Sequence, residues 1–215
     1  MILYRCCWVL FFAQLVAGFF FDFSWMWGWI PLGLAIVLQF AVNRQPVLPD
    51  PSRAVEVGLP VTGRWPALNS PADKVPSHGT HGYGQSYAID IVAEPEDQAR
   101  PRFGWWPVVR RNRDFPAFGA PLLAVADATV VRTTNRHRDH LQRGSLAVRE
   151  GDRVRAGQPL ARCGNSGNST EPHVHFQLMD GPDLDVAHGV PFSWRGVGVP
   201  GNGEVFSADE EPAMP

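Results

Sequence analysis

The sequence predicts an all-β domain preceded by an N-terminal hydrophobic helical membrane segment. Short β-prone runs, broken by glycine and proline, continue from Val55 to Phe192 without a convincing amphipathic helix among them. Residues 1–43 differ from this pattern, because they are apolar over almost their whole length. The 215 residues of the chain are enough for one domain of common size together with a membrane segment.

The N-terminal segment contains two apolar stretches, 8–21 and 25–42, separated by only three residues. A helix needs about 20 residues to span a bilayer, so the second stretch qualifies and the first is marginal. We therefore expect a membrane anchor or a helical hairpin over 1–43, in contact with membrane lipid. Arg5 and Arg44 flank the segment, and two spans would place both in the cytoplasm, so the number and orientation of spans stay open.

The domain boundaries follow from changes in composition. Residues 44–54 contain three prolines, which predicts a short, stiff linker. The β domain is expected over 55–192. Residues 193–215 are rich in glycine and become acidic toward their end, which predicts a flexible acidic tail.

Charge and cysteine content exclude two classes of protein. The formal net charge is -2, which argues against a nucleic-acid partner because such a partner requires a broad basic surface. Cys6 and Cys7 are neighbours in an apolar run and Cys163 stands alone, so the sequence offers no disulfide framework. Without a Cys-x-x-Cys motif, any metal site must consist of histidine and carboxylate.

The stretch 163–178 is the most informative part of the chain. A run of turn-forming residues leads into an alternating segment that predicts a strand, with His173, His175 and Gln177 on one face. Two imidazoles on one strand face can both reach a small site, one as a metal ligand and one beside the water on the metal. The alternative interpretation is a half-exposed strand whose histidines have no role.

A second candidate strand, 87–92, carries a single carboxylate. Asp90 lies between Ile89 and Ile91, on the face opposite to them. A carboxylate on a buried strand needs a partner that offsets its desolvation. A metal ion and an arginine both meet that need, so the residues leave the two alternatives open.

The segment 164–178, G-N-S-G-N-S-T-E-P-H-V-H-F-Q-L, closely resembles the closing motif of the LytM/lysostaphin-type zinc endopeptidases, which cut peptide cross-links in bacterial cell walls. The resemblance extends over roughly 60–192. It implies an antiparallel β-sheet domain of the lysostaphin type, similar to a duplicated hybrid motif. It also implies that His175 is a zinc ligand and that His173 assists catalysis.

The opening motif of that family, H-x-x-x-D, normally supplies the first two zinc ligands. Here Ser86 stands at the position of the histidine, whereas His78 and His81 precede a glycine-rich turn before Asp90. The S-H-G sequence is similar to the H-x-G pattern of the family, which favours His78 as the first ligand and leaves His81 as the alternate. The resemblance thus implies one zinc ion per chain, bound by His78, Asp90 and His175 with water in the fourth position.

A further histidine of the family lies in an A-H-L motif at the end of a strand. His140-Leu141 resembles that motif, which implies a catalytic role for His140 beside His173. The residues before it, 133–139, are polar and unlike a strand. The central segment is therefore shorter than the family pattern predicts.

Together with the apolar N-terminal segment, the resemblance implies a membrane-anchored zinc metalloendopeptidase that hydrolyses peptide bonds of peptidoglycan stems or cross-bridges. Its expected location is the cell membrane, with the domain facing outward, and its expected partners are peptidoglycan peptide and membrane lipid. The shortened central segment supports an alternative. In that alternative the domain is degenerate and non-catalytic, and it binds cell-wall peptide or regulates a partner hydrolase.

Overall fold

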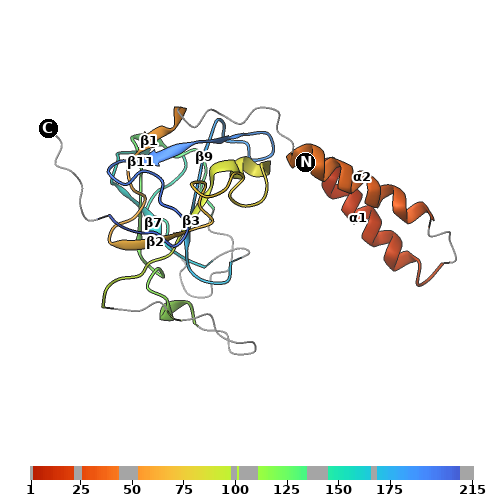
Figure 1. Ribbon diagram of the computed structural model, residues 1–215, viewed down its shortest axis with the longest axis horizontal. Helices are drawn as coiled ribbons and strands as arrows, with labels where there is room; N and C mark the ends of the chain where they lie inside the picture. Colours follow the sequence, from red (N-terminus) through yellow and green to blue (C-terminus); the bar gives the residue numbers. More distant parts are fainter. Residues whose placement is uncertain are drawn as a thin grey trace.

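The computed structural model describes residues 2–21, 26–43, 53–97, 101, 111–134, 145–165 and 169–208 (Figure 1). The helices in the described part are α1 (Ile2–Ala17) and α2 (Met26–Asn43), with the 3-10 helices η2 (Gly82–Tyr87) and η3 (Asn112–Asp114). The strands are β1 (Val55–Val57), β2 (Arg64–Leu68), β3 (Ile89–Ile91), β4 (Pro121–Leu123), β5 (Ala128–Thr129), β6 (Arg153–Val154), β7 (Pro159–Arg162), β8 (Val174–Phe176), β9 (Leu178–Met179), β10 (Gly189–Val190), β11 (Phe192–Trp194) and β12 (Val205–Ser207).

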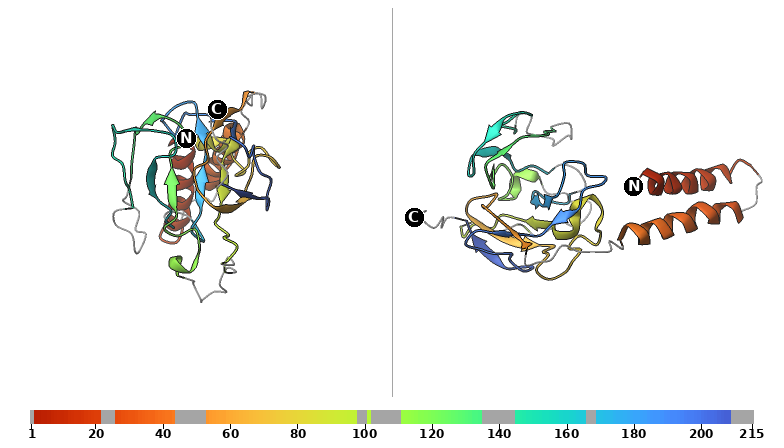
Figure 2. Two further views of the ribbon diagram at one scale, coloured as in Figure 1. Left: turned by 90° about the vertical axis from the view of Figure 1, so that its left-hand side faces the viewer. Right: turned by 90° about the horizontal axis from the view of Figure 1, so that it is seen from above.

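The expected N-terminal membrane segment is not supported. Helices α1 and α2 lie side by side, and they contain 16 and 18 residues (Figure 2). At about 1.5 Å per residue they are about 24 and 27 Å long, whereas the hydrocarbon core of a bilayer is about 30 Å thick. Within the ranges that the structure describes, none of the helices combines the length and the apolar character needed to cross a membrane.

The all-β prediction is also wrong, because the fold mixes helices with small strands. Besides α1 and α2, the predicted glycine-rich turn before β3 contains the 3-10 helix η2. The strands are only two to five residues long and form several small sheets. Proline and glycine shorten them, since proline lacks an N–H donor for the ladder and glycine lacks a side chain to pack.

The largest sheet has four antiparallel strands in the order β12-β2-β3-β8. Strand β3 lies between β2 and β8, and its isoleucines Ile89 and Ile91 are fully buried. On β8 the alternation predicted from sequence is confirmed, because Val174 is buried and Phe176 packs against the same core. The polar faces of β3 and β8 are therefore turned to one side of the sheet.

The remaining described strands pair two by two. Strand β1 is parallel to β11, while β9–β10, β4–β7 and β5–β6 are antiparallel. The main core contains two tryptophans that are 1% exposed, Trp65 and Trp194. A second, smaller cluster forms around Ala124, Val148 and Val154. The strands that follow residue 54 thus share one principal core, and the sheet that contains β3 and β8 packs against it.

The C-terminal segment departs from the predicted flexible tail. Residues 193–208 are folded: β11 extends through Trp194, and β12 adds an edge strand to the main sheet beside β2. Phe206 is 7% exposed and its ring lies 5.2 Å from that of Trp194. The apolar alternation of this short strand was obscured by the surrounding glycines. Residues 209–215, and 44–52 of the predicted linker, lie outside the described residues.

Candidate metal centre

Asp90 occupies the middle of the candidate site. It is the central residue of β3, with Leu68 of β2 as its partner on one side and His175 of β8 on the other. Its side chain is 12% exposed. The pairing of the sheet therefore fixes both the position of this carboxylate and its distance from β8.

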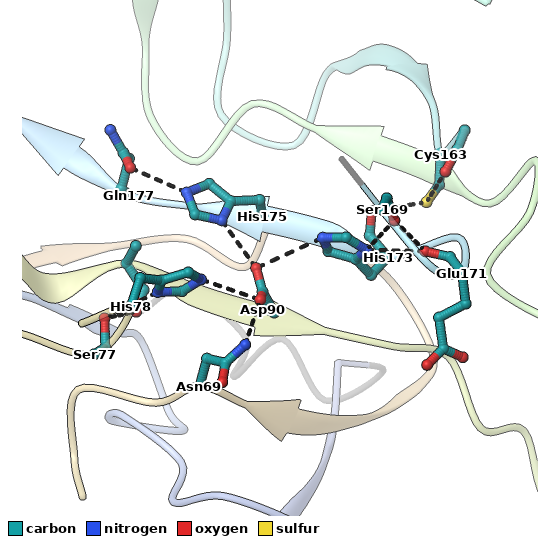
Figure 3. A network of polar contacts seen from close by, with 12 residues as sticks. Asn69, Ser77, His78, Asp90, Cys163, Ser169, Glu171, His173, His175 and Gln177 are labelled. Atoms are coloured by element: carbon teal, nitrogen blue, oxygen red, sulfur yellow. Dashed lines mark hydrogen bonds and ion pairs between the residues drawn. The ribbon is translucent and has the colours of Figure 1, made fainter. Parts of the chain in front are cut away.

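His78 reaches Asp90 from the loop before η2, with its Nε2 3.0 Å from Asp90 Oδ2 (Figure 3). The other ring nitrogen, Nδ1, lies 3.1 Å from Ser77 Oγ. The Ser77 hydroxyl donates to the carbonyl of Ala88 at 2.6 Å, so toward His78 it acts as the acceptor. His78 accordingly carries a proton on Nδ1, and its Nε2 is the nitrogen that faces Asp90.

His175 approaches the other carboxylate oxygen, with its Nδ1 2.9 Å from Asp90 Oδ1. Its Nε2–H donates to Gln177 Oε1 at 3.0 Å. The amide of Gln177 is oriented by a second bond, from its Nε2 to the carbonyl of Tyr83 at 2.9 Å. Since Tyr83 O can only accept, the oxygen end of Gln177 faces His175, and the lone pair of the neutral His175 ring lies on Nδ1.

The ligand atoms of His78, Asp90 and His175 lie within 4.8 Å of one another, the one such group among the residues that the structure describes. In each histidine, a neighbouring acceptor holds the proton on the nitrogen that faces away from Asp90. The remaining lone pairs face carboxylate oxygens, and two acceptors at about 3 Å need a proton or a cation between them. Two imidazoles and one carboxylate are a donor set that suits zinc, so the residues fit that ion.

The ionisation of Asp90 agrees with this arrangement. With protons between the rings and the carboxylate, burial raises the pKa of the Asp90 carboxyl, but hydrogen bonds from His175, His78 and Asn69, together with the positive charge on His78, hold that pKa well below its ordinary value. For His175, burial lowers the pKa, while Asp90 and Gln177 outweigh that effect and raise it. Asp90 is thus ionised at neutral pH, as a metal ligand must be.

His173 lies beside this group without belonging to it. Its Nδ1 is 2.9 Å from the carbonyl of Glu171 and 3.0 Å from Ser169 Oγ. Ser169 itself donates to the same carbonyl, so Nδ1 of His173 is the protonated nitrogen. Its Nε2 then faces the site, 3.7 Å from Asp90 Oδ1, and can accept a proton there.

One further predicted residue lies away from the site. His81, the alternate first ligand, is buried and contacts Ser86 Oγ through Nδ1 at 3.0 Å. Burial lowers the pKa of His81. His140 lies outside the described residues. Of the two candidate first ligands, the structure therefore brings only His78 to Asp90.

Two polar contacts of the site had no role in the sequence-based prediction. Asn69, at φ 48° just after β2, donates from Nδ2 to Asp90 Oδ2 at 2.8 Å. The amide side chain of Gln177 contacts His175. Strand alternation places Gln177 on the face of His175, so its contact could have been found from sequence. The contact of Asn69 depends on the pairing of β2 with β3, for which the sequence carries no signal.

Residues 137–186 match the model of peptidase family M23, a segment that contains His173 and His175 and lies after Asp90. No solved structure matches the chain. The match includes the closing motif that resembles the LytM-type enzymes, and it supports membership of peptidase family M23.

Proposed function

We propose that the chain is a zinc metalloendopeptidase that hydrolyses peptide bonds of peptidoglycan stems or cross-bridges. The observation that carries this proposal is the convergence of three lone-pair donors, His78 Nε2, an Asp90 carboxylate oxygen and His175 Nδ1. Three protein ligands leave a fourth position for water or substrate, which is the arrangement of catalytic zinc sites. The match of residues 137–186 to peptidase family M23 supports the same class of reaction.

A zinc ion bound here would supply Lewis acidity and lower the pKa of a coordinated water to about 7. The chain itself supplies the proton transfer. His173 accepts a proton from the attacking water at Nε2, because its Nδ1–H is held by Glu171 and Ser169. The imidazolium can then return the proton to the leaving amine nitrogen as the C–N bond breaks, which restores neutral His173.

Access to the site is consistent with a polymeric substrate. The side chains of His173 and His175 are 25% and 34% exposed, whereas that of Asp90 is 12% exposed. In the described sheet β8 is the last strand, so the face that carries both histidines lies at an edge of the sheet. An extended peptide can approach such an edge from solvent. The cell-wall nature of the peptide rests on the resemblance of the closing motif to the LytM-type enzymes.

The test combines metal analysis with cleavage of purified peptidoglycan by the full chain. We expect about one zinc per chain and release of peptide fragments that mass spectrometry identifies. Asp90→Ala should lose both zinc and cleavage. Asp180→Ala is the matched control, because Asp180 pairs with His188 at 3.1 Å in an exposed loop. Cleavage that persists in Asp90→Ala would refute the site, and zinc-loaded protein without any cleavage would favour a non-catalytic, peptide-binding domain.

A further inference from the structure

Gln177 contacts both parts of the chain that carry the candidate histidine ligands. Its Oε1 accepts from His175 on β8 (Figure 3). Its Nε2 donates to the carbonyl of Tyr83 within η2. Helix η2 ends the loop that begins near His78. One amide therefore bridges the strand ligand and the loop that holds the other histidine.

Only an amide meets both requirements. His175 presents an N–H and needs an acceptor, while the carbonyl of Tyr83 needs a donor. A carboxylate could accept from His175 but could not donate to Tyr83, and an aliphatic side chain could do neither. Gln177 also donates to Met179 Sδ at 3.0 Å, which helps to fix its orientation.

The backbone that Gln177 contacts is in an uncommon conformation. Tyr83 has φ 60° and Gly84 has φ 69°, two consecutive residues in the left-handed region. For a residue with a Cβ, such as Tyr83, this conformation is strained, because the Cβ lies too close to a backbone carbonyl oxygen. A hydrogen bond to the Tyr83 carbonyl stabilises that turn, so loss of the amide donor should let the loop relax.

We propose that Gln177 is a positioning residue that couples the two histidine ligands. It holds the His175 ring so that Nδ1 faces Asp90, and it holds η2 so that the loop from His78 keeps its conformation. The part that concerns metal binding rests on the proposed zinc site. The part that concerns the loop can be tested in metal-free protein.

The experiment compares three variants of the full chain with wild type. Gln177→Met removes both hydrogen bonds at similar length, and Gln177→Glu keeps an acceptor for His175 but has no donor for Tyr83. Gln158→Met is the matched control. Gln158 Oε1 also accepts a hydrogen bond, from the backbone N–H of Arg155, but it does so in an exposed turn that contains none of the candidate site residues. Zinc affinity is measured by competition with a chelator, and hydrogen exchange of 82–87 is measured in the metal-free chain by mass spectrometry.

We expect Gln177→Met to weaken zinc binding by about 10- to 100-fold, the usual effect of losing the outer partner of a histidine ligand. Gln177→Glu should recover part of that affinity. Both variants should exchange 82–87 faster by about tenfold or more, because the same bond is lost in each. Gln158→Met should match wild type in both measurements.

Two results would contradict the proposal that Gln177 couples the two histidine ligands. One is unchanged exchange of 82–87 in Gln177→Met, which would show that the amide does not hold the loop. The other is a zinc affinity of Gln177→Glu no better than that of Gln177→Met, which would show that its acceptor does not position His175. If wild type binds no zinc, the proposed function fails, and exchange still decides whether Gln177 holds the loop.

Discussion

Asp90 and His175 are direct partners across the β3–β8 pair, and Asp90 Oδ1 lies 2.9 Å from His175 Nδ1. Backbone pairing between the two strands thus sets the distance between two of the three candidate ligands. The third, His78, comes from a loop, and its imidazole packs edge-on against that of His175 with ring centroids 4.8 Å apart. The site therefore combines a rigid part, formed by the sheet, with a part that depends on loop conformation.

The choice between His78 and His81 gives the first prediction. His78→Ala should abolish zinc binding, because a site with three protein ligands loses one of them. His81→Ala should keep zinc, since His81 contacts Ser86 and is not among the converging ligands. Metal analysis of the two full-length variants checks this. Retention of zinc in His78→Ala with loss in His81→Ala would reverse the assignment.

Sequence reasoning worked best where strand periodicity decides the outcome. The alternation on 173–178 correctly predicted a core-facing Val174 and a polar face with His175. It also placed Asp90 on a buried strand between two isoleucines. Which of two histidines in a glycine-rich loop returns to that carboxylate could not be derived from periodicity. Glycine conformations such as that of Gly84, which no side-chain pattern reveals, determine the course of the loop.

The prediction of the overall fold class was wrong for a different reason. Two apolar stretches, of which the second was judged long enough to span a bilayer, predicted a membrane segment at the N-terminus, but α1 and α2 have only 16 and 18 residues, and neither qualifies as a span. At the other end, glycine and acidic residues predicted a tail, although Phe206 packs into the core. The pairing of β12 with β2 is a contact between segments far apart in the sequence, and local composition cannot predict such a contact.

The second prediction tests whether the C-terminal segment belongs to the core. Phe206→Ala should lower the free energy of unfolding by about 3–5 kcal/mol, the usual cost of truncating a buried phenylalanine. Val205→Ala, the control, should change it by about 0.5 kcal/mol or less, because Val205 is 38% exposed. Urea denaturation measures both. Equal, small effects would mean that β12 adds little to stability.

The third prediction concerns pH. Burial lowers the pKa of His81 from its ordinary value of 6.5, so the folded chain binds fewer protons at this residue than the unfolded chain. The stability that neutral His81 contributes is fully present above its ordinary pKa of about 6.5. It is lost as the pH falls below that value toward the lowered pKa of the folded chain. Wild type should thus lose more free energy of unfolding between about pH 7.5 and 5 than His81→Gln. Parallel curves for the two proteins would contradict a buried, neutral His81.

The fourth prediction separates catalysis from metal binding. His173→Ala should keep zinc and lose about 10²-fold or more in the rate of peptide cleavage, the scale for a positioned acid or base. Ser169→Ala should show a smaller loss, because the Glu171 carbonyl still accepts from His173 Nδ1. Metal content and initial cleavage rates are measured on the same preparations. Loss of zinc in His173→Ala would make His173 a ligand.

The last prediction tests how tightly the loop from His78 is packed. A Cβ at Gly84 would lie 2.5 Å from Met179 Cγ, and the residue has φ 69°, so Gly84→Ala combines a clash with backbone strain. Gly157 has φ 78°, and a Cβ added there would meet no atom within 4 Å, so Gly157→Ala introduces the strain alone, about 1–2 kcal/mol. We therefore expect Gly84→Ala to be the more destabilised of the two in urea denaturation. It should also weaken zinc binding, because either η2 or the Met179 side chain, which contacts Gln177, must shift. Gly157→Ala should bind zinc as wild type does. Equal stability of the two variants together with equal zinc affinity would show that the loop yields to the added methyl group without moving His78.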